Sequence, residues 1–316
     1  MGSNSHPRIF AATPEVIARA AQLLREGRLV AVPTETVYGL AARADADDAV
    51  AAIYRAKGRP AFNPLIVHVP GIAIAQTLAE FDSRAHALAN RFWPGPLTLV
   101  LPRRASAPLA DAVTAGLPTV ALRCPAHPVM QQLLAAVALP LAAPSANRSA
   151  AISPTAAGHV AQSLGDAVDL ILDGGACERG LESTIVALRP GGGWEILRSG
   201  PIGRSELVAV LGASGEDRRE PGMIEAPGQM SRHYSPGKPM RLGIEHADAD
   251  EFHIGFGAVA GDITLSARGD PREAARRLYQ CLHAAAAAEQ RRIAVAPVPE
   301  QGLGIAINDR LRRAAS

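Results

Sequence analysis

Residues 57–68, with the sequence KGRPAFNPLIVH, hold the densest set of ligand-binding side-chain types in the chain. Lys57, Arg59 and Asn63 are interrupted by two prolines, which fix φ and stop a helix, so we expect a stiff loop before an apolar strand. A stiff loop with two cations suits an anionic ligand such as a nucleotide phosphate, because little ordering entropy is lost on binding. A solvated basic turn before an ordinary strand is the alternative.

Three more polar clusters stand beside predicted strands, where open α/β sheets bind their ligands. They are PTETVYGL at 33–40, the pair Thr119 and Arg123, and PSAN at 144–147 followed by Ser-Pro-Thr at 153–155. Thr119 and Arg123 are four residues apart in one strand and therefore share a face. A helix start with hydroxyls can bind phosphate, whereas Ser153 alone could equally be a helix cap. Four such clusters together favour a binding site over a structural role.

Several common active-site motifs are absent from the sequence. It contains no P-loop GxxxxGK[ST], no HExxH and no GxSxG, which disfavours P-loop ATPases, zinc proteases and α/β-hydrolases. The segment GFGAVAG at 255–261 has one residue too many for a dinucleotide-binding motif, so we favour a turn between strands. The nine histidines show no ligand spacing, and we expect no metal site.

The length of 316 residues indicates about two domains, and a content of 48% hydrophobic and 20% charged residues indicates a globular protein. A net charge of +2 and 4% aromatic residues argue against a protein that binds nucleic acid by charge and stacking. The three cysteines are far apart in the sequence, which fits a reducing cytoplasm. We recognise neither a signal peptide nor a membrane-spanning run.

Helices and strands alternate through the first two thirds of the chain, which predicts an α/β fold. Strands are expected at 29–32, 65–69, 97–101, 119–123, 139–142, 168–172, 184–188 and 194–197. Helices are expected at 14–26, 47–56, 84–91, 128–136, 154–164 and 205–211. The strand pairs 97–101 with 119–123 and 184–188 with 194–197 have no helix between them. The sheet should therefore be partly antiparallel.

The composition changes after Pro201, and residues 212–237 are rich in Gly, Pro, Ser and charge without a hydrophobic period. We predict a main domain at 10–205, a linker at 206–237 and a small α/β domain at 238–316. The linker holds SRHYSP at 231–236, more functional side chains than a spacer needs, so we expect it to act as a lid. The last domain should have strands at 240–244, 252–256, 263–265 and 293–296, and helices at 271–289 and 303–313.

The chain resembles the threonylcarbamoyl-AMP synthase family, which has a YrdC-like fold, in its long two-domain form. The resemblance lies in PTETVYGLA, KGRPAFNPLIVHV, WPGPLTLVL, APSANRSAAISPT, LESTIV, ILRSGPI and RHYSP, which follow one another from about residue 30 to residue 236. It implies a twisted mixed parallel and antiparallel sheet around a concave basic cavity, and a small Rossmann-like domain at the C-terminus.

The resemblance also implies an activity. The family forms threonylcarbamoyl-AMP and pyrophosphate from L-threonine, bicarbonate and ATP. A downstream transferase complex then moves the threonylcarbamoyl group to an adenosine next to the anticodon of tRNA. Since no carboxylate cage is recognisable, Mg²⁺ would be carried mainly by ATP. No protein nucleophile is required, so catalysis would rest on positioning and charge neutralisation.

Individual roles follow from the same resemblance. The expected threonine contacts are Thr36, His68, Arg123 and Ser183. The expected ATP contacts are Arg59, Asn63, Thr119, Ser145, Ser153, Arg198 and Tyr234, and the expected catalytic cations are Lys57 and Arg59. Residue 143 is alanine where many relatives carry threonine, so only a backbone contact would persist there.

Two other functions are compatible with parts of the sequence. A YrdC-like concavity could bind an RNA duplex without catalysis, although the small net charge and few aromatic residues count against this. A related domain serves carbamoyl transfer in hydrogenase maturation, but those proteins are longer and carry zinc-finger cysteines that this sequence lacks. Release of pyrophosphate from ATP only with both threonine and bicarbonate would distinguish the enzyme from these alternatives.

Overall fold

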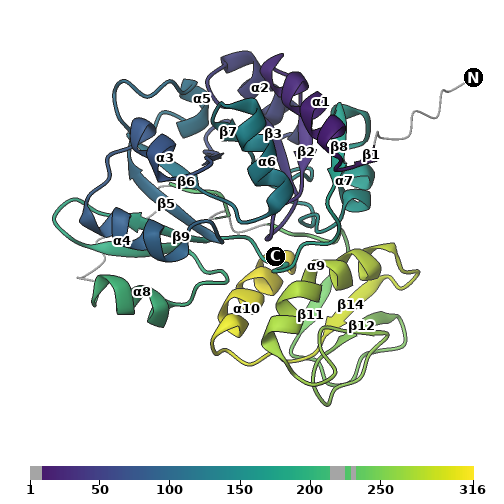
Figure 1. Ribbon diagram of the computed structural model, residues 1–316. Coiled ribbons are helices and arrows are strands. Elements are labelled where there is room, and N and C mark those ends of the chain that lie inside the picture. The colour runs from purple at the N-terminus through teal and green to yellow at the C-terminus, as the bar shows by residue number, and fades with distance from the viewer. Residues whose placement is uncertain (1–8, 214–224, 229–232) are drawn as a thin grey trace, which may run out of the picture.

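The computed structural model describes residues 9–213, 225–228 and 233–316, which form a larger N-terminal body and a smaller C-terminal body (Figure 1). Among these residues, the larger body is built on a ten-stranded sheet and the smaller body on a four-stranded sheet. The expected mixed α/β fold with a separate small α/β unit is therefore confirmed. Within the described ranges, none of the helices combines the length and the apolar character needed to cross a bilayer.

The large sheet has the strand order β1–β8–β2–β3–β7–β4–β6–β5–β9–β10. The strands are β1 (Ile9–Ala11), β2 (Val30–Val32), β3 (Gly39–Arg43), β4 (Ile66–His68), β5 (Leu97–Pro102), β6 (Thr119–Arg123), β7 (Leu141–Ala142), β8 (Leu170–Asp173), β9 (Thr184–Leu188) and β10 (Trp194–Arg198). The pairs β5–β6 and β9–β10 are antiparallel as predicted, although the expectation that no helix lies between β5 and β6 is wrong, because the short helix α5 (Asp111–Thr114) stands there. The pairs β4–β6 and β5–β9 are parallel, so the sheet is mixed.

The helices of the larger body are α1 (Pro14–Arg25), α2 (Asp47–Lys57), α3 (Ile72–Leu78), α4 (Ser83–Phe92), α5 (Asp111–Thr114), α6 (Pro128–Val137), α7 (Ala157–Leu164) and α8 (Arg204–Leu211), with a 3₁₀ turn at Gly165–Ala167. Thr13 caps α1 as expected, because its hydroxyl accepts a hydrogen bond from the amide of Val16. Helix α2 ends at Gly58 in the left-handed conformation, also as expected. Helix α7 begins at Ala157, three residues later than the sequence suggested.

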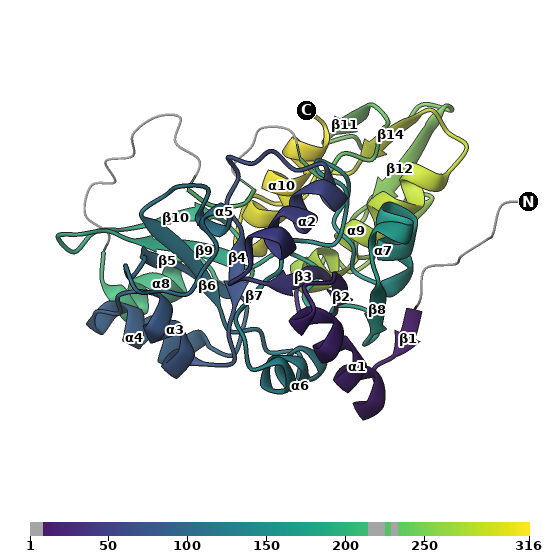
Figure 2. The ribbon, with the colours of Figure 1, turned by 90° about the horizontal axis from the view of Figure 1, so that it is seen from above.

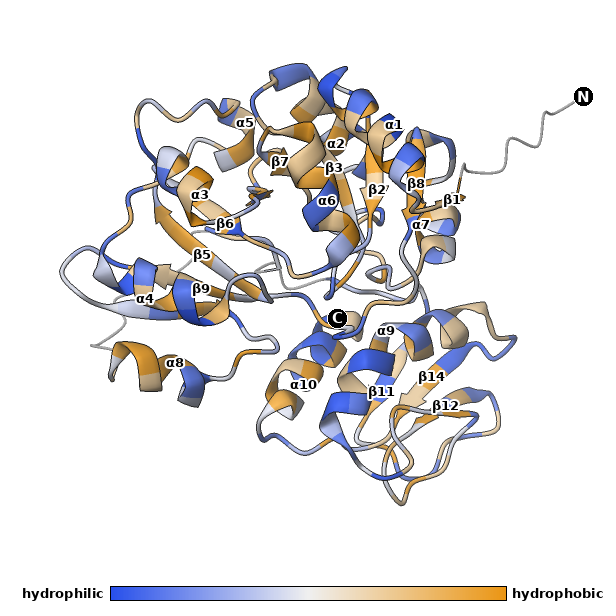
Figure 3. Ribbon diagram, viewed as in Figure 1, coloured by the Kyte–Doolittle hydropathy of each residue, from blue (hydrophilic) through white to orange (hydrophobic). Residues whose placement is uncertain are grey.

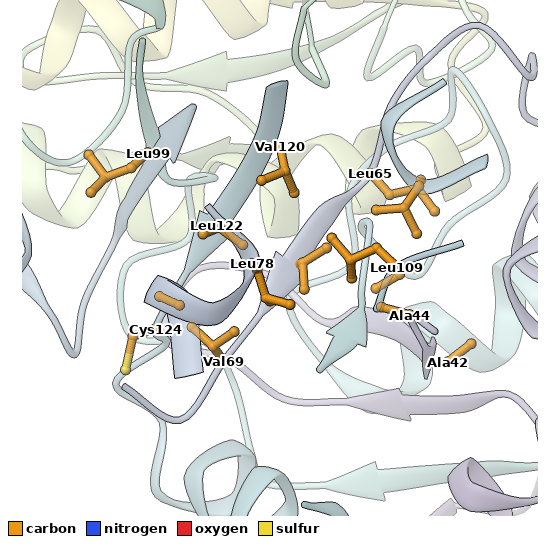
Figure 4. Packing of buried hydrophobic residues seen from close by; sticks show 14 of the residues in the cluster. Ala42, Ala44, Leu65, Val69, Leu78, Leu99, Leu109, Val120, Leu122 and Cys124 are labelled. Atoms are coloured by element: carbon orange, nitrogen blue, oxygen red, sulfur yellow. The ribbon is translucent and has the colours of Figure 1, made fainter. Parts of the chain in front are cut away.

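The hydrophobic core fills both sides of the large sheet. Leu99 of β5 and Leu122 of β6 are fully buried with Leu78 of α3 in one cluster (Figure 4). In a second cluster, α1 and α6 pack against each other and cover β2 and β8. The central strands of the large sheet are accordingly mostly hydrophobic, whereas most helices carry polar residues on part of their surface (Figure 3).

The C-terminal body has a sheet of the order β11–β14–β12–β13. Its strands are β11 (Met240–Leu242), β12 (Glu251–Gly255), β13 (Ile263–Thr264) and β14 (Arg292–Val295), all parallel, and its helices are α9 (Pro271–Ala287) and α10 (Leu303–Ala314). Asp270 caps α9, as predicted, by accepting from the amide of Arg272 at 2.8 Å.

Helices α9 and α10 connect the two bodies. They lie between the small sheet and the larger body, on the side of the large sheet away from α1 and α6 (Figures 1 and 2). Their buried residues form one cluster with Val37, Ile152 and Leu181 of the larger body and with Tyr234 of the predicted linker. The contact between the bodies is therefore a continuous hydrophobic core rather than a few surface contacts.

Candidate active site

A pocket opens on the side of the large sheet that faces the C-terminal body. It is lined by Thr34, Thr36, Val37, Gly39, Arg59, Ile66, His68, Arg123, Ala143, Pro144, Ser145, Glu182, Arg198, Pro227, Gly228, His233 and Tyr234. His68 and Arg123 end the neighbouring parallel strands β4 and β6 and are paired in register. Arg198 ends β10, and Thr34 and Thr36 belong to the loop between β2 and β3. The sheet thus brings polar side chains from distant parts of the sequence to one place.

One wall of the pocket is polar but uncharged. The hydroxyls of Thr34 and Thr36 lie 2.9 Å apart, and that of Thr34 also donates to the carbonyl of Val37 at 2.6 Å. His68 is 3% exposed, and within the described part of the chain neither ring nitrogen has a hydrogen-bond partner. Burial, followed by the nearby charge of Arg123, lowers the pKa of His68 to about 3. Its ring is therefore neutral at pH 7 and can both donate to and accept from a ligand.

Arg123 supplies a cation next to this wall. Its Nη2 donates to Oε1 of Glu35 at 2.6 Å, and its Nε donates to the carbonyl of Gly95 at 3.3 Å. The second carboxylate oxygen of Glu35 accepts from the amide of Ala126 at 3.1 Å. The guanidinium is therefore fixed in orientation and offsets a buried carboxylate before any ligand binds.

Arg59 also lines the pocket and is held by its own loop. Its Nη2 donates to the side-chain oxygen of Asn63 at 2.6 Å and to the carbonyl of Pro64 at 2.8 Å. Nε donates to the carbonyl of Asn63 at 3.1 Å. Burial lowers the pKa of Arg59 to about 10, so it keeps its charge at neutral pH. The loop of residues 59–64 is thus organised around this guanidinium.

Arg198 adds a second buried guanidinium to the pocket. It donates from Nε to the carbonyl of Ser183 at 3.1 Å and from Nη2 to the hydroxyl of Ser183 at 3.0 Å. Burial lowers its pKa, and an arginine guanidinium nevertheless stays protonated in proteins. Arg59, Arg123 and Arg198 give the pocket a positive field that suits a polyanionic ligand.

Lys57 lies behind the pocket rather than in its lining. It is 3% exposed, and its Nζ donates to the carbonyls of Ser145 and Asn147. Burial and the neighbouring charge of Arg59 hold its pKa well below the usual lysine value. Lys57 therefore ties the loop that carries Ser145 to the end of α2.

The residues singled out from the sequence fall into three groups. Those that line the pocket are Thr36, Arg59, His68, Ser145, Arg123, Arg198 and Tyr234. Those that hydrogen-bond a lining residue from behind are Lys57, Asn63, Ser153 and Ser183. Thr119 stands at the far end of β6, opposite Pro102, and does not line this pocket. Four residues along a strand span about 13 Å, so sharing a face with Arg123 does not bring Thr119 to the same site.

Two acidic residues of the site went unnoticed in the sequence. Glu35 pairs with Arg123, and Glu182 lines the pocket next to Ser183. Each of these glutamates stands in a polar sequence motif among residues that are buried. A charged residue among buried positions indicates that a residue of opposite charge lies nearby. Ala143 is also among the lining residues, and its methyl side chain cannot donate a hydrogen bond to a ligand.

The linker contributes part of the lining through Pro227, Gly228, His233 and Tyr234. Ser231 and Arg232 of the SRHYSP segment lie outside the described residues. Tyr234 is 1% exposed, and its ring lies 5.5 Å from that of Tyr279 of α9. Burial lowers the pKa of His233 to about 3, so this ring is also neutral at pH 7.

Two family models cover nearly the whole chain. The Sua5–YciO–YrdC model, described as telomere recombination, matches residues 22–200, and a model described as the C-terminal domain of threonylcarbamoyl-AMP synthase matches residues 202–316.

Similar proteins agree with these models. A threonylcarbamoyl-AMP synthase of Pyrococcus abyssi is 39% identical over 94% of this chain and 93% of its own length. One of Bacillus subtilis is 39% identical over 95% of this chain and 92% of its own length. The crystal structure of P. abyssi Sua5 complexed with L-threonine superimposes with a TM-score of 0.88 at 36% identity, covering 98% of this chain and 96% of that one.

Proposed function

This chain belongs to the threonylcarbamoyl-AMP synthase family, and from that membership we propose that the pocket described above is its active site. The chain is an enzyme that forms threonylcarbamoyl-AMP and acts on L-threonine. The comparisons support this activity and not the alternative of a non-catalytic RNA-binding module. The assignment of residues to substrates is our proposal.

One observation carries the assignment of the site. One pocket is lined by Thr34, Thr36, His68 and Arg123, which we group as its first wall, and by Arg59 and Arg198, which we group as its second wall. The first wall suits an amino acid, which has a carboxylate, an amine and a small side chain. The second wall suits phosphates, because guanidinium groups bind them through paired N–H donors. The two ligands would then meet at the centre of the pocket.

We assign the threonine end to Thr36, His68 and Arg123, with Ser183 in support. Arg123 would bind the threonine carboxylate, in competition with Glu35, which already occupies its Nη2. His68, neutral and without a protein partner among the described residues, would pair with a polar group of threonine. Ser183 hydrogen-bonds both Thr98 and Arg198, so it links this end to the phosphate end.

We assign the ATP end to Arg59, Ser145, Arg198 and Tyr234. Asn63 orients Arg59, and Lys57 holds the loop of Ser145, so both act on the nucleotide through a neighbour in this arrangement. Ser153 donates its hydroxyl to Glu182 at 2.6 Å, which leaves that hydroxyl only as an acceptor toward a ligand. Thr119 would contact ATP only at the far end of β6.

The proposed reaction needs orientation rather than a protein nucleophile. The threonine amine adds to carbon dioxide derived from bicarbonate and loses a proton, which gives a carbamate. A carbamate oxygen then attacks the α-phosphorus of ATP, and the bond from that phosphorus to the bridging oxygen breaks as pyrophosphate leaves. Arg59 and Arg198 would neutralise the charge that develops on the phosphates. Burial of the pocket strengthens each of these interactions.

The remaining assignments concern partners and location. We propose that Mg²⁺ arrives with the phosphates of ATP, because both oxygens of Glu182, the carboxylate in the pocket lining, already accept hydrogen bonds from protein groups. The product would pass to a transferase complex that modifies tRNA. We propose a cytoplasmic location, consistent with three buried cysteines that form no disulfide.

We also propose that the linker at 206–237 covers the nucleotide between a catalytic domain at 10–205 and a small domain at 238–316. The support is that Pro227, Gly228, His233 and Tyr234 contribute to the pocket lining. A cover that excludes water would slow hydrolysis of the reactive product.

The decisive experiment follows the carbon of bicarbonate. Purified protein is incubated with ATP, Mg²⁺, L-threonine and ¹³C-bicarbonate, with each component omitted in turn. We expect pyrophosphate release only in the complete mixture, and a product whose mass contains threonine, AMP and one ¹³C. Pyrophosphate release without threonine, or a product without the label, would contradict the proposed reaction.

A further inference from the structure

The carboxylate of Glu182 is one of the lining groups that the C-terminal body contacts. Glu182 lines the pocket and is 5% exposed. Its Oε2 accepts from Nε of Arg310 at 2.9 Å, and both its oxygens lie within hydrogen-bonding distance of the Tyr279 hydroxyl, at 2.8 and 2.9 Å. Arg310 belongs to α10 and Tyr279 to α9, and both are fully buried. A residue of the pocket lining is therefore held mainly from the other body.

Arg310 makes two further contacts, one beside a lining residue and one with a lining residue. Its Nη2 donates to the carbonyl of Ser199 at 2.8 Å, directly after Arg198. Its guanidinium carbon also lies 5.5 Å from the ring centroid of Tyr234, within the range of a cation–π contact. One buried side chain thus touches the carboxylate of Glu182, the backbone next to Arg198 and the ring of Tyr234, and we assign Arg198 and Tyr234 to the nucleotide end of the pocket.

The contacts of Glu182 make it an anchored group rather than a free one. Besides Arg310 and Tyr279, the hydroxyl of Ser153 donates to Oε1 at 2.6 Å. The two oxygens therefore receive four contacts, which is about the number a carboxylate can accept. Burial alone would raise the pKa of Glu182, but the charges of Arg310 and Arg198 lower it to about 2. The carboxylate stays charged at every pH at which the protein would be assayed.

We propose that Arg310 and Tyr279 are positioning residues for the nucleotide end of the active site, acting through Glu182 and through the backbone beside Arg198. The inference rests on the proposed function and gives the C-terminal body a role in catalysis beyond that of an appended domain. A purely structural role would be expected to fasten the two bodies at their hydrophobic cluster. It would not require a buried arginine whose three nitrogens reach Glu182, Ser199 and Asp309.

The test uses the full-length chain with Arg310→Lys. Lysine keeps the charge but has one nitrogen in place of a planar fork, so it cannot hold Glu182 and Ser199 together. We expect the KM for ATP to rise about tenfold, since hydrogen bonds to a charged group are lost at the nucleotide end. The dissociation constant of threonine, measured by calorimetry, should stay within about twofold of the wild-type value, because His68 and Arg123 do not contact Arg310.

Two companion variants separate positioning from folding. Tyr279→Phe removes only the hydroxyl that donates to Glu182 and should raise the KM for ATP in the same direction by a smaller factor. Arg312→Lys, on the same helix but with a side chain that is 57% exposed, is the matched control and should leave both ligands unaffected. Circular dichroism establishes that each variant is folded at the assay temperature.

The outcomes distinguish this inference from the proposed function. If folded Arg310→Lys and Tyr279→Phe proteins both keep the wild-type KM and kcat, the inference is wrong while the proposed function stands. If ATP and threonine weaken in parallel, Arg310 has only a general structural role and the inference is also wrong. If the wild-type protein makes no threonylcarbamoyl-AMP, the proposed function fails, and calorimetric ATP binding to the same variants still decides whether Arg310 positions the nucleotide site.

Discussion

Arg123, which lines the pocket, and Glu35 form a buried ion pair, with Nη2 and Oε1 2.6 Å apart and both side chains 5% exposed. The pair fixes the direction in which the guanidinium can receive a ligand carboxylate. It also means that a threonine carboxylate must share the arginine with Glu35 rather than find an uncompensated cation. A buried ion pair of this kind gains little net stability, but the loss of one partner is costly.

Replacing Arg123 with alanine should therefore have two effects. Threonine should bind about 30- to 150-fold more weakly, since a charge-assisted pair worth about 2–3 kcal/mol is lost. The free energy of unfolding should also fall, by about 3–5 kcal/mol, because Glu35 is left buried and unpaired. The double variant Arg123→Ala with Glu35→Gln should recover part of this stability without recovering threonine binding. Threonine affinity within threefold of wild type in either folded variant would contradict the assignment.

A second prediction separates the two ends of the pocket. Arg59→Ala should weaken ATP binding by about tenfold or more and leave threonine binding nearly unchanged, because Arg59 stands on the wall assigned to phosphate. Asn63→Ala should weaken ATP binding less, since its side chain acts by orienting Arg59. In the double variant the effect of Asn63→Ala should disappear, which a double-mutant cycle by calorimetry would detect. Equal weakening of both ligands would indicate a folding defect instead.

Much of the fold follows from local patterns that physical rules interpret directly. The stop of α2 at Gly58 and the antiparallel pairing of β9 with β10 could be predicted because glycine in the left-handed conformation and closely spaced strands leave few alternatives. Strand β3, at Gly39–Arg43, was not predicted. Its first four residues are all buried, so it lacks the polar and apolar alternation that identifies a strand.

The polar clusters at the strand ends could be predicted from the sequence. The position of each side chain relative to the pocket could not. Whether Lys57 lines the pocket or supports it from behind depends on the direction of one side chain, which sequence spacing does not determine. The link between Glu182 and Arg310 was equally inaccessible. These residues are 128 positions apart and meet only because α10 packs against the larger body. Tertiary contacts between domains leave no local pattern in the sequence.

The third prediction concerns acid stability. The pKa of His68 is lowered to about 3 by burial and by Arg123, whereas an unfolded histidine titrates near 6.5. Between these two values the unfolded chain binds a proton that the folded chain does not, so stability is lost as the pH falls below about 6.5. At pH 5 this amounts to about 2 kcal/mol.

Urea unfolding of His68→Gln at pH 7 and pH 5 measures this contribution. The loss of stability between the two pH values should be smaller in the variant than in wild type by about 2 kcal/mol, because glutamine does not titrate. His233, whose pKa is also lowered to about 3, is present in both proteins and cancels in the comparison. An identical loss in His68→Gln and wild type would show that His68 is protonated in the folded state.

The last prediction tests the contact between the linker and the pocket. Gly228 has φ of +86°, and a Cβ added there would lie 2.9 Å from Cδ of Arg198 and 3.4 Å from the hydroxyl of Tyr234. Gly228→Ala should therefore displace Arg198 and weaken ATP binding severalfold, in addition to a cost of about 1 kcal/mol for the left-handed conformation. Gly191→Ala is a matched control, since Gly191 has φ of +84° but open space around an added Cβ. It should lose similar stability and bind ATP normally. Equal ATP affinity in the two variants, measured by calorimetry on folded protein, would refute a linker that closely contacts the nucleotide site.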